Sequence, residues 1–105
     1  MLERITSLKN VRVKYWRELN RKSEQEVGRI VFFAEGEHMV SEALSERKAC
    51  ELIISEKKQE RFSELVHLAC DQNICTYIVT DDIINSITET KAPQGICCVC
   101  CVERP

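Results

Sequence analysis

The sequence predicts an α/β fold in which a mostly parallel sheet is covered by helices. Short apolar segments recur along the chain without polar alternation, which is typical of strands buried on both faces. Amphipathic segments of helical length separate them, and this alternation indicates layered packing of helices on a sheet. The 105 residues, 44% hydrophobic and 30% charged, fit one globular domain over residues 1–105. The expected order of elements is α-β-α-β-α-β-α-β.

The first predicted element is a helix over residues 11–21. Asn10 precedes it and is a favourable N-cap, because its side chain can accept a hydrogen bond from a backbone N–H of the first turn. Residues 22–28 are polar and predict a connection without regular structure. Aromatic residues at helical spacing usually pack on the core. The helix is therefore expected to dock through Tyr15, Trp16 and Leu19.

The remaining elements follow from apolar runs bounded by polar or turn-forming residues. Strands are expected where the runs are short, and helices where apolar residues recur every three or four positions. The helix after the first strand is expected to face the core with Met39, Val40, Ala43 and Leu44. The predicted series is strand 30–34, a helix opened by Glu35 and Gly36, strand 51–54, helix 58–72, strand 75–79, a short helix capped by Thr80 and Asp81, and strand 96–102.

Four of the seven cysteines lie in this last strand, within Ile96-Cys97-Cys98-Val99-Cys100-Cys101-Val102. The Cys-x-x-Cys spacing resembles half of a zinc site. On a strand, however, residues three apart point to opposite faces, so neither pair could bind one ion without breaking the strand. Free cysteine packs well as a small hydrophobic residue. A buried core strand with reduced thiols is expected, and no metal site.

Charge is distributed unevenly along the chain. Residues 1–22 contain seven cations against Glu3 and Glu18, while the remainder carries eight cations against fifteen carboxylates. A basic end on an acidic body suggests one surface that faces a polyanion. The alternative is a solvated helix face that has no partner.

No catalytic constellation is evident in the sequence. His38 and His67 are the only histidines and have no neighbours at metal-ligand spacing; the three glycines are too few for a phosphate-binding loop. No apolar run approaches the ~20 residues of a membrane span, and charged residues interrupt the N-terminus, which therefore lacks a signal-peptide core. A non-catalytic cytoplasmic protein that is not inserted in a membrane is expected.

Three segments together carry a family resemblance. They are Ile5-Thr6-Ser7-Leu8-Lys9-Asn10-Val11-Arg12-Val13-Lys14, Phe33-Ala34-Glu35-Gly36-Glu37 running into Ala43-Leu44, and Thr90-Lys91-Ala92-Pro93-Gln94-Gly95-Ile96. In that order they resemble the N-terminal substrate-binding domain of the SpoU-type (TrmH family) RNA 2′-O-ribose methyltransferases.

The resemblance implies a fold, a ligand and a separate catalytic domain in the parent protein. The fold would be an L30e-like three-layer α/β/α sandwich, and the ligand RNA, with ribosomal RNA favoured. The SPOUT-type catalytic domain of the family is absent from this chain. The parent protein would be an RNA methyltransferase that binds S-adenosylmethionine and forms a homodimer through that domain, whereas this chain would need no cofactor.

The family motifs fall on Ser7, Asn10, Val13 and Lys14, on Glu35 and Gly36, and on Thr90, Pro93, Gln94 and Gly95. Each has a structural alternative: Asn10 and Glu35 can cap helices, and the glycines can satisfy backbone geometry. Pro93 and Gly95 also suit a type I turn. The candidate RNA-binding residues are Lys9, Asn10, Arg12, Lys14, Arg17, Arg21, Glu35, Gly36, Thr90, Lys91, Gln94 and Gly95.

The chain departs from the family pattern in two places. Val11 replaces the usual proline after the first motif's asparagine, and Lys22-Ser23-Glu24 stands where members have a Lys-aromatic-Arg sequence. Arg21 or Lys22 can substitute for that arginine. Two other functions stay open. One is a protein-interaction or dimerisation module using Trp16, Phe32 or Phe33, and the other is a non-catalytic RNA scaffold of the L30e type.

Overall fold

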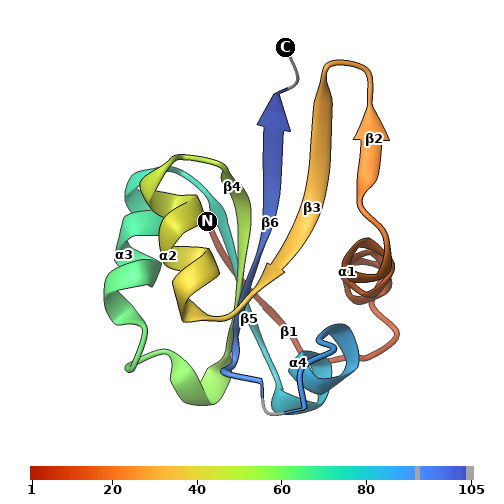
Figure 1. The fold of residues 1–105 in the computed structure, drawn as a ribbon. Coiled ribbons are helices and arrows are strands. Elements are labelled where there is room, and N and C mark those ends of the chain that lie inside the picture. The colour runs from red at the N-terminus through yellow and green to blue at the C-terminus, as the bar shows by residue number, and fades with distance from the viewer. Residues whose placement is uncertain (92, 104–105) are drawn as a thin grey trace.

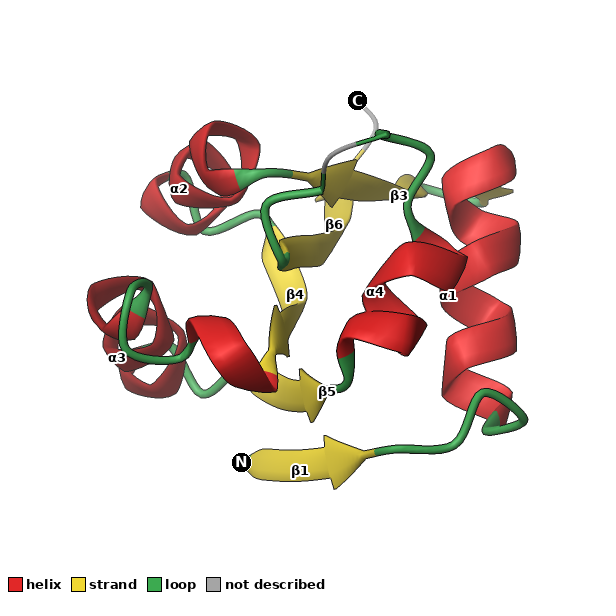
Figure 2. Ribbon diagram, turned by 90° about the horizontal axis from the view of Figure 1, so that it is seen from below, coloured by secondary structure: helices red, strands yellow, loops and turns green. Residues whose placement is uncertain are grey.

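A central sheet lies between two pairs of helices in the computed structural model, which describes residues 1–91 and 93–103. Helices α2 and α3 cover one face and α1 and α4 the other (Figure 1; Figure 2). This arrangement confirms the predicted α/β fold with three layers. The elements are β1 (Leu2–Ile5), α1 (Val11–Arg21), β2 (Glu24–Glu26), β3 (Arg29–Glu35), α2 (Glu37–Ser45), β4 (Ala49–Ser55), the 3₁₀ turn η1 (Glu56–Lys58), α3 (Ser63–Asp71), β5 (Cys75–Val79), α4 (Asp81–Ile87) and β6 (Ile96–Glu103).

The sheet has the strand order β1-β5-β4-β6-β3-β2 and is mixed. The expected parallel pairing holds for β1, β5 and β4, whereas β6, β3 and β2 join antiparallel. After β5 the chain passes through α4 and re-enters the sheet beside the end of β4, where Ile96 pairs with Ile54. From there β6 runs antiparallel to β4.

Two strands were not predicted. β1 buries only Ile5, and β2 consists of Glu24, Gln25 and Glu26 within the stretch expected to be a connection. Neither carries a buried apolar run, and both lie at sheet edges, so the strand pattern that sequence reasoning relies on is absent. The predicted helix 58–72 is divided into η1 and α3.

The first helix begins and docks as predicted. Asn10 is its N-cap, and its Oδ1 accepts a hydrogen bond from Arg12 N at 2.8 Å. Trp16 is fully buried against the sheet, with its ring 5.2 Å from that of Tyr77 in an edge-on arrangement. Its Nε1 donates to Glu51 Oε1 at 2.8 Å. The aromatic face of α1 is therefore core, as expected.

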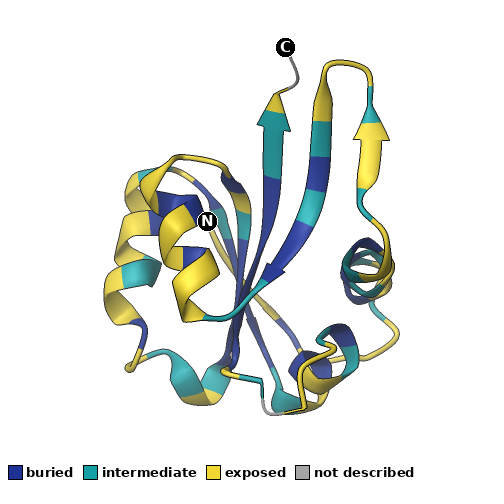
Figure 3. Cartoon of the chain, viewed as in Figure 1, coloured by how far each residue is buried: buried dark blue, intermediate teal, exposed yellow. Residues whose placement is uncertain are grey.

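The cysteine-rich segment is the central strand β6, confirming the core-strand prediction. Its side chains alternate between the two core layers: Cys97 and Val99 pack under α1 and α4, while Cys98 and Cys100 pack under α2 and α3. Figure 3 shows this buried middle of the sheet between exposed outer helix faces. Burial, with a smaller contribution from Glu35, raises the pKa of the Cys97 thiol above its ordinary value. Among the described residues, no three histidine, cysteine or carboxylate side chains form a group able to hold a metal ion.

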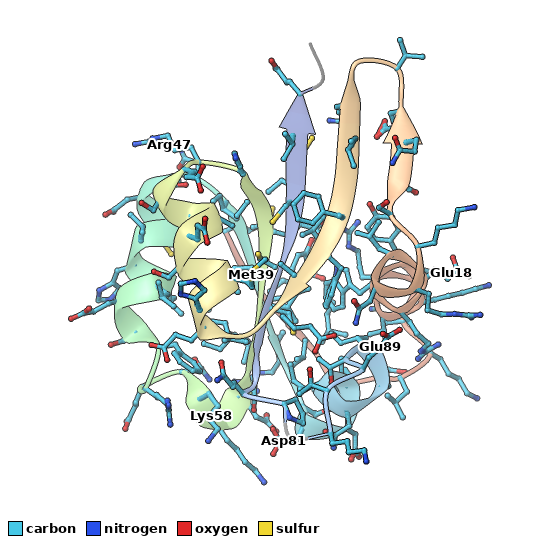
Figure 4. The ribbon with its side chains drawn as sticks, viewed as in Figure 1. Glu18, Met39, Arg47, Lys58, Asp81 and Glu89 are labelled. Carbon is cyan, nitrogen blue, oxygen red and sulfur yellow. The ribbon has the colours of Figure 1, made fainter. Side chains whose placement is uncertain are left out.

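The helix α2 departs from the expected core stripe at one position. Val40, Ala43 and Leu44 are buried as predicted, whereas Met39 is 47% exposed. Met39 lies on the side of α2 next to the end of β3 (Figure 4) and borders a surface hollow there. In the described parts of the chain, no helix has the length and apolar character needed to cross a membrane.

Candidate functional site

The second and third motifs meet at one corner of the molecule. Strand β3 ends at Glu35, and Gly36, with φ of +94°, turns the chain into α2. Gly36 N donates to Ile96 O at 2.9 Å, which fixes this turn to the start of β6. The loop between α4 and β6 lies at the same end of the sheet (Figure 2). We call the β3–α2 turn and residues 88–95 of this loop the corner; Ala92 of the third motif lies outside the described residues.

The carboxylate of Glu35 holds the corner together. Its Oε2 accepts hydrogen bonds from Asn20 Nδ2 at 2.6 Å and from Glu89 N at 3.0 Å. Its Oε1 accepts one from Thr90 Oγ1 at 2.6 Å. Burial raises the pKa of Glu35, but the hydrogen bonds from Thr90, Asn20 and the backbone together outweigh it, so the net pKa lies below the ordinary value. Glu35 is thus an ionised brace between α1, β3 and the loop.

Gln94, rather than Glu35, caps the helix that follows. The Oε1 of Gln94 accepts a hydrogen bond from Glu37 N at 2.6 Å, and Gly36 itself offers no side chain for this purpose. Because Gln94 lies 57 positions after Glu37 in the chain, this hydrogen bond joins the loop to the beginning of α2. No described residue accepts a hydrogen bond from the Gln94 amide nitrogen, and the side chain is exposed. Its two N–H groups are therefore available at the surface.

Two hollows border Gln94. The smaller, of about 270 Å³, lies between the β3–α2 turn and the loop; the larger, of about 610 Å³, lies between the beginnings of α2 and α3. Gln94 and His38 line both, so they form the ridge between the two hollows. The smaller hollow combines apolar Met39, Pro93 and Ile96 with the polar side chains of Glu35, Thr88, Thr90 and Gln94.

Gly95 is required by packing as well as by conformation. It is buried with φ of +84°, and its carbonyl accepts a hydrogen bond from Ser55 N at 2.8 Å. A Cβ at this position would lie 2.8 Å from Lys58 Cγ and 3.2 Å from Ser55 Cβ. At Gly36 a Cβ would lie 3.2 Å from Gln94 Oε1. Backbone conformation and close packing therefore explain both glycines. This is the structural alternative to a role in RNA binding at these positions.

The candidate cations of α1 differ in their surroundings. Lys14 and Arg21 are exposed on the helix, and Lys9 is exposed in the turn before it. Arg17 is half-buried and donates from Nη2 to Ser86 Oγ of α4 at 3.2 Å. Figure 4 shows side chains reaching into solvent around α1, beside Glu18. These four residues are arranged on or next to one helix, while Lys91 is exposed in the corner loop.

Arg12 is placed differently from the other candidates. It forms an ion pair with Glu51, and its guanidinium lies 5.5 Å from the ring centres of both Tyr15 and Tyr77. Its charge is thus paired within the domain and helps to dock α1 on the sheet. Asn10 is likewise occupied as the N-cap. The structure therefore brings Glu35, Gly36, Thr90, Gln94 and Gly95 together, and supplies a packing role for Arg12 and a capping role for Asn10.

Sequence reasoning missed Asn20, which joins α1 to the corner. Its Nδ2 donates to Glu35 Oε2 and also to Ile87 O, the latter at 2.8 Å. Asn20 lies seven residues after Val13 and four after Trp16, so it shares their core-facing side of the helix. A polar residue on an apolar helix face needs a hydrogen-bond partner inside the protein. The position of Asn20 on the face of Val13 and Trp16 was therefore the sequence signal that could have identified it.

The residues proposed for a protein interface are mostly inaccessible. Trp16 is fully buried and Phe33 is 9% exposed, both in the core beneath α1. Phe32 is partly buried on the opposite face, beside α2. An interface built on Trp16 or Phe33 would require the core to open, whereas Phe32 borders a surface hollow beside α2.

The chain belongs to the MRM3-like substrate-binding domain family, whose model matches residues 10–98. This membership confirms the expected resemblance to the substrate-binding domain of SpoU-type methyltransferases.

Individual relatives agree with the family. The chain is 33% identical over 99 residues to the 23S rRNA (guanosine(2553)-2'-O)-methyltransferase RlmP of Bacillus subtilis, covering 94% of this chain and 38% of that protein. A crystal structure of an rRNA methyltransferase from Sinorhizobium meliloti superposes with a TM-score of 0.76 at 25% identity, covering 99% of this chain and 38% of that one. Its AdoMet-bound form gives a TM-score of 0.76 at 25% identity, with 98% and 37% covered. The chain thus spans less than half of the length of these relatives.

Replacement of Gly95 by alanine tests the packing of the corner. Gly28 has the same φ of +84°, but no atom lies within 4 Å of the place that a Cβ would occupy, so Gly28→Ala reports backbone strain alone. We expect Gly28→Ala to lower the free energy of unfolding by about 1–2 kcal/mol. Gly95→Ala should cost a further ~1–3 kcal/mol, because Ser55 and Lys58 must move. Urea unfolding of both variants measures the difference, and equal losses would contradict the packing argument.

The ionisation of Glu35 predicts a pH dependence of stability. Because its pKa is lowered by folding, Glu35 contributes stability above its ordinary pKa of 4.5, and this contribution is lost as the pH falls through the folded-state value. Glu35→Gln removes the titrating group. We expect the wild type to exceed Glu35→Gln in unfolding free energy at pH 7, and the gap to narrow as the pH falls below 4.5. Denaturant titrations at several pH values measure the gap; a gap independent of pH would rule out the ionised brace.

Proposed function

We propose that this chain is the RNA-binding, substrate-recognition domain of an RNA 2′-O-ribose methyltransferase that acts on ribosomal RNA. Family membership supports the substrate-binding role, and the name of the Bacillus subtilis relative supports the ribosomal target. The observation that carries the proposal is the corner itself. It presents the exposed amide nitrogen of Gln94 and is tied directly to the basic helix α1 through Asn20 and Glu35.

The two parts of this surface suit different components of RNA. Exposed lysine and arginine side chains bind phosphates, which gives affinity without reading sequence. An amide N–H can donate to a base edge or to a 2′-hydroxyl, and so distinguishes one RNA from another. We assign the phosphate contacts to Lys9, Lys14, Arg17, Arg21 and Lys91, and the discriminating contact to Gln94.

Methyl transfer then belongs to another part of the parent protein. In this proposal a SPOUT-type catalytic domain outside these residues binds S-adenosylmethionine and forms the homodimer. The present domain holds the RNA near that catalytic domain. Linking a binding module to a catalytic one raises the effective concentration of the substrate, so modest affinity in the isolated module is sufficient.

Binding to RNA should depend steeply on salt. With three to five cations engaged, the slope of log K against log salt concentration is expected to be about −2 to −4. Lys14→Ala and Arg21→Ala should each flatten the slope by about one and weaken all RNAs alike. Fluorescence anisotropy with ribosomal RNA fragments at several salt concentrations measures both quantities.

A cation outside the proposed surface provides the control. Arg47 is exposed at the far end of α2 (Figure 4) and has a φ of 57°. Asparagine tolerates this conformation, so Arg47→Asn removes the charge with little backbone strain. We expect its slope to match the wild type. Absence of RNA binding at low salt, or equal flattening by Arg47→Asn and Lys14→Ala, would contradict the proposal.

The isolated chain is expected not to bind S-adenosylmethionine. A site for this ligand needs backbone donors for its carboxylate and an apolar slot for adenine, whereas the two hollows beside Gln94 are open and the polar side chains of His38 and Gln94 border both. Isothermal titration of the 105-residue chain with S-adenosylmethionine should give no heat of binding. Micromolar affinity would contradict the assignment of the methyl donor to another domain.

A further inference from the structure

We propose that Asn20 and Glu35 are positioning residues that set the orientation of Gln94 for RNA discrimination without contacting the RNA themselves. The inference rests on the proposed function, because it assigns the means by which the same surface reads its ligand. It replaces the expectation that Glu35 contacts RNA directly.

Most of the acceptor capacity of Glu35 is used inside the domain, where its carboxylate accepts three hydrogen bonds. Both carboxylate oxygens accept hydrogen bonds, two of them at 2.6 Å, from Asn20 and Thr90. The third donor is the backbone N–H of Glu89. Hydrogen bonds to an ionised carboxylate are roughly twice as strong as those between neutral groups. These three hydrogen bonds therefore account for the position of the Glu35 carboxylate without an RNA contact.

The loop is fixed to the β3–α2 turn at two points. Glu89 and Thr90 are held by Glu35, and Gln94 is held by Glu37 N at 2.6 Å. Glu35 and Glu37 are separated only by Gly36, where a Cβ would crowd Gln94 Oε1. The direction of the Gln94 amide is therefore set by how closely the loop approaches this turn. The Glu35 hydrogen bonds control that approach.

Asn20 extends the same constraint to the basic helix. Its amide bridges the Glu35 carboxylate and the carbonyl of Ile87 at the end of α4. A second link joins the helices through Arg17 and Ser86. These hydrogen bonds join the helix that carries the α1 cations to the turn that holds the Gln94 amide. In this proposal, an RNA whose phosphates bind α1 therefore presents a base to Gln94 in a fixed register.

The experiment compares discrimination, measured as the ratio of affinities for two ribosomal RNA fragments, among single and double variants. Glu35→Gln keeps the shape of the side chain but removes the charge that strengthens its hydrogen bonds and leaves only one of its two acceptor oxygens. Gln94→Ala removes the reading group. We expect each to lower the ratio about tenfold, and the double variant to lower it no further than either single variant. The salt slope should stay unchanged in all three, since no contact to a phosphate is lost.

Glu42→Gln is the matched control. Glu42 is an exposed carboxylate on α2 that pairs with His38 and, among the described residues, makes no hydrogen bond to the loop. It should leave the ratio unchanged. Asn20→Ala should behave like Glu35→Gln. A variant that merely lowers the folded fraction would weaken both RNAs equally and preserve the ratio, which distinguishes a positioning role from a loss of stability.

A second readout does not require RNA. Hydrogen exchange of the Glu37 amide, capped by Gln94, should accelerate in Glu35→Gln at least severalfold more than that of a core amide such as Val99 of β6, and remain unchanged in Glu42→Gln. Unchanged protection of this amide, or a ratio in Glu35→Gln equal to that of the wild type, would overturn the inference. Failure of the wild type to bind RNA would instead overturn the proposed function, while the exchange measurement would still decide whether Glu35 positions Gln94.

Discussion

The carboxylate of Glu35 is the point at which the first helix, the third strand and the loop before the last strand are joined. Strand register places it there: Glu35 pairs with Cys97, and its side chain emerges on the face that α1 covers. At that position it meets Asn20 and Thr90. A charged group held by several donors tolerates partial burial, because each hydrogen bond offsets part of the cost of leaving water. Helix α1, the end of β3 and the loop are therefore held to one another through Glu35.

The surface also depends on where the chain re-enters the sheet after α4. Strand β6 begins beside the end of β4, and Gly36 N donates to Ile96 O, so the preceding loop lies next to the β3–α2 turn. Gly95 allows this close approach, since its buried backbone packs against Ser55 and Lys58 with no room for a side chain. The antiparallel entry of β6 and the gathering of the candidate binding residues thus occur at the same place.

Much of the fold could be predicted from local pattern. The bounds of α1 and its Asn10 cap, the Thr80 cap of α4 and the buried cysteine strand all follow from spacing and capping chemistry within a few residues. The direction of β6 could not be predicted, because antiparallel and parallel core strands are equally apolar here. The edge strand β2 was not predicted because it is composed of glutamates and glutamine.

The candidate site could also be predicted only in part from the sequence. The residues of the second and third motifs lie together, but Glu35 is a brace because of Asn20 and Thr90, and Gln94 is a helix cap because of Glu37. Arg12 has the charge expected of a phosphate contact, yet it is paired with Glu51. Charge and motif position are visible in a sequence, whereas the partner that occupies a group is not.

The corner and the basic helix should act as one RNA-binding surface, because Glu35 and Asn20 join them. NMR titration of the ¹⁵N-labelled domain with a ribosomal RNA fragment can locate the bound surface residue by residue. We expect the largest shift changes at the Gln94 side-chain amide and at the backbone amides of Glu37, Lys14 and Arg21. Changes concentrated instead in the β2–β3 hairpin or on the outer face of α3 would show that RNA binds elsewhere and that the corner has no part in recognition.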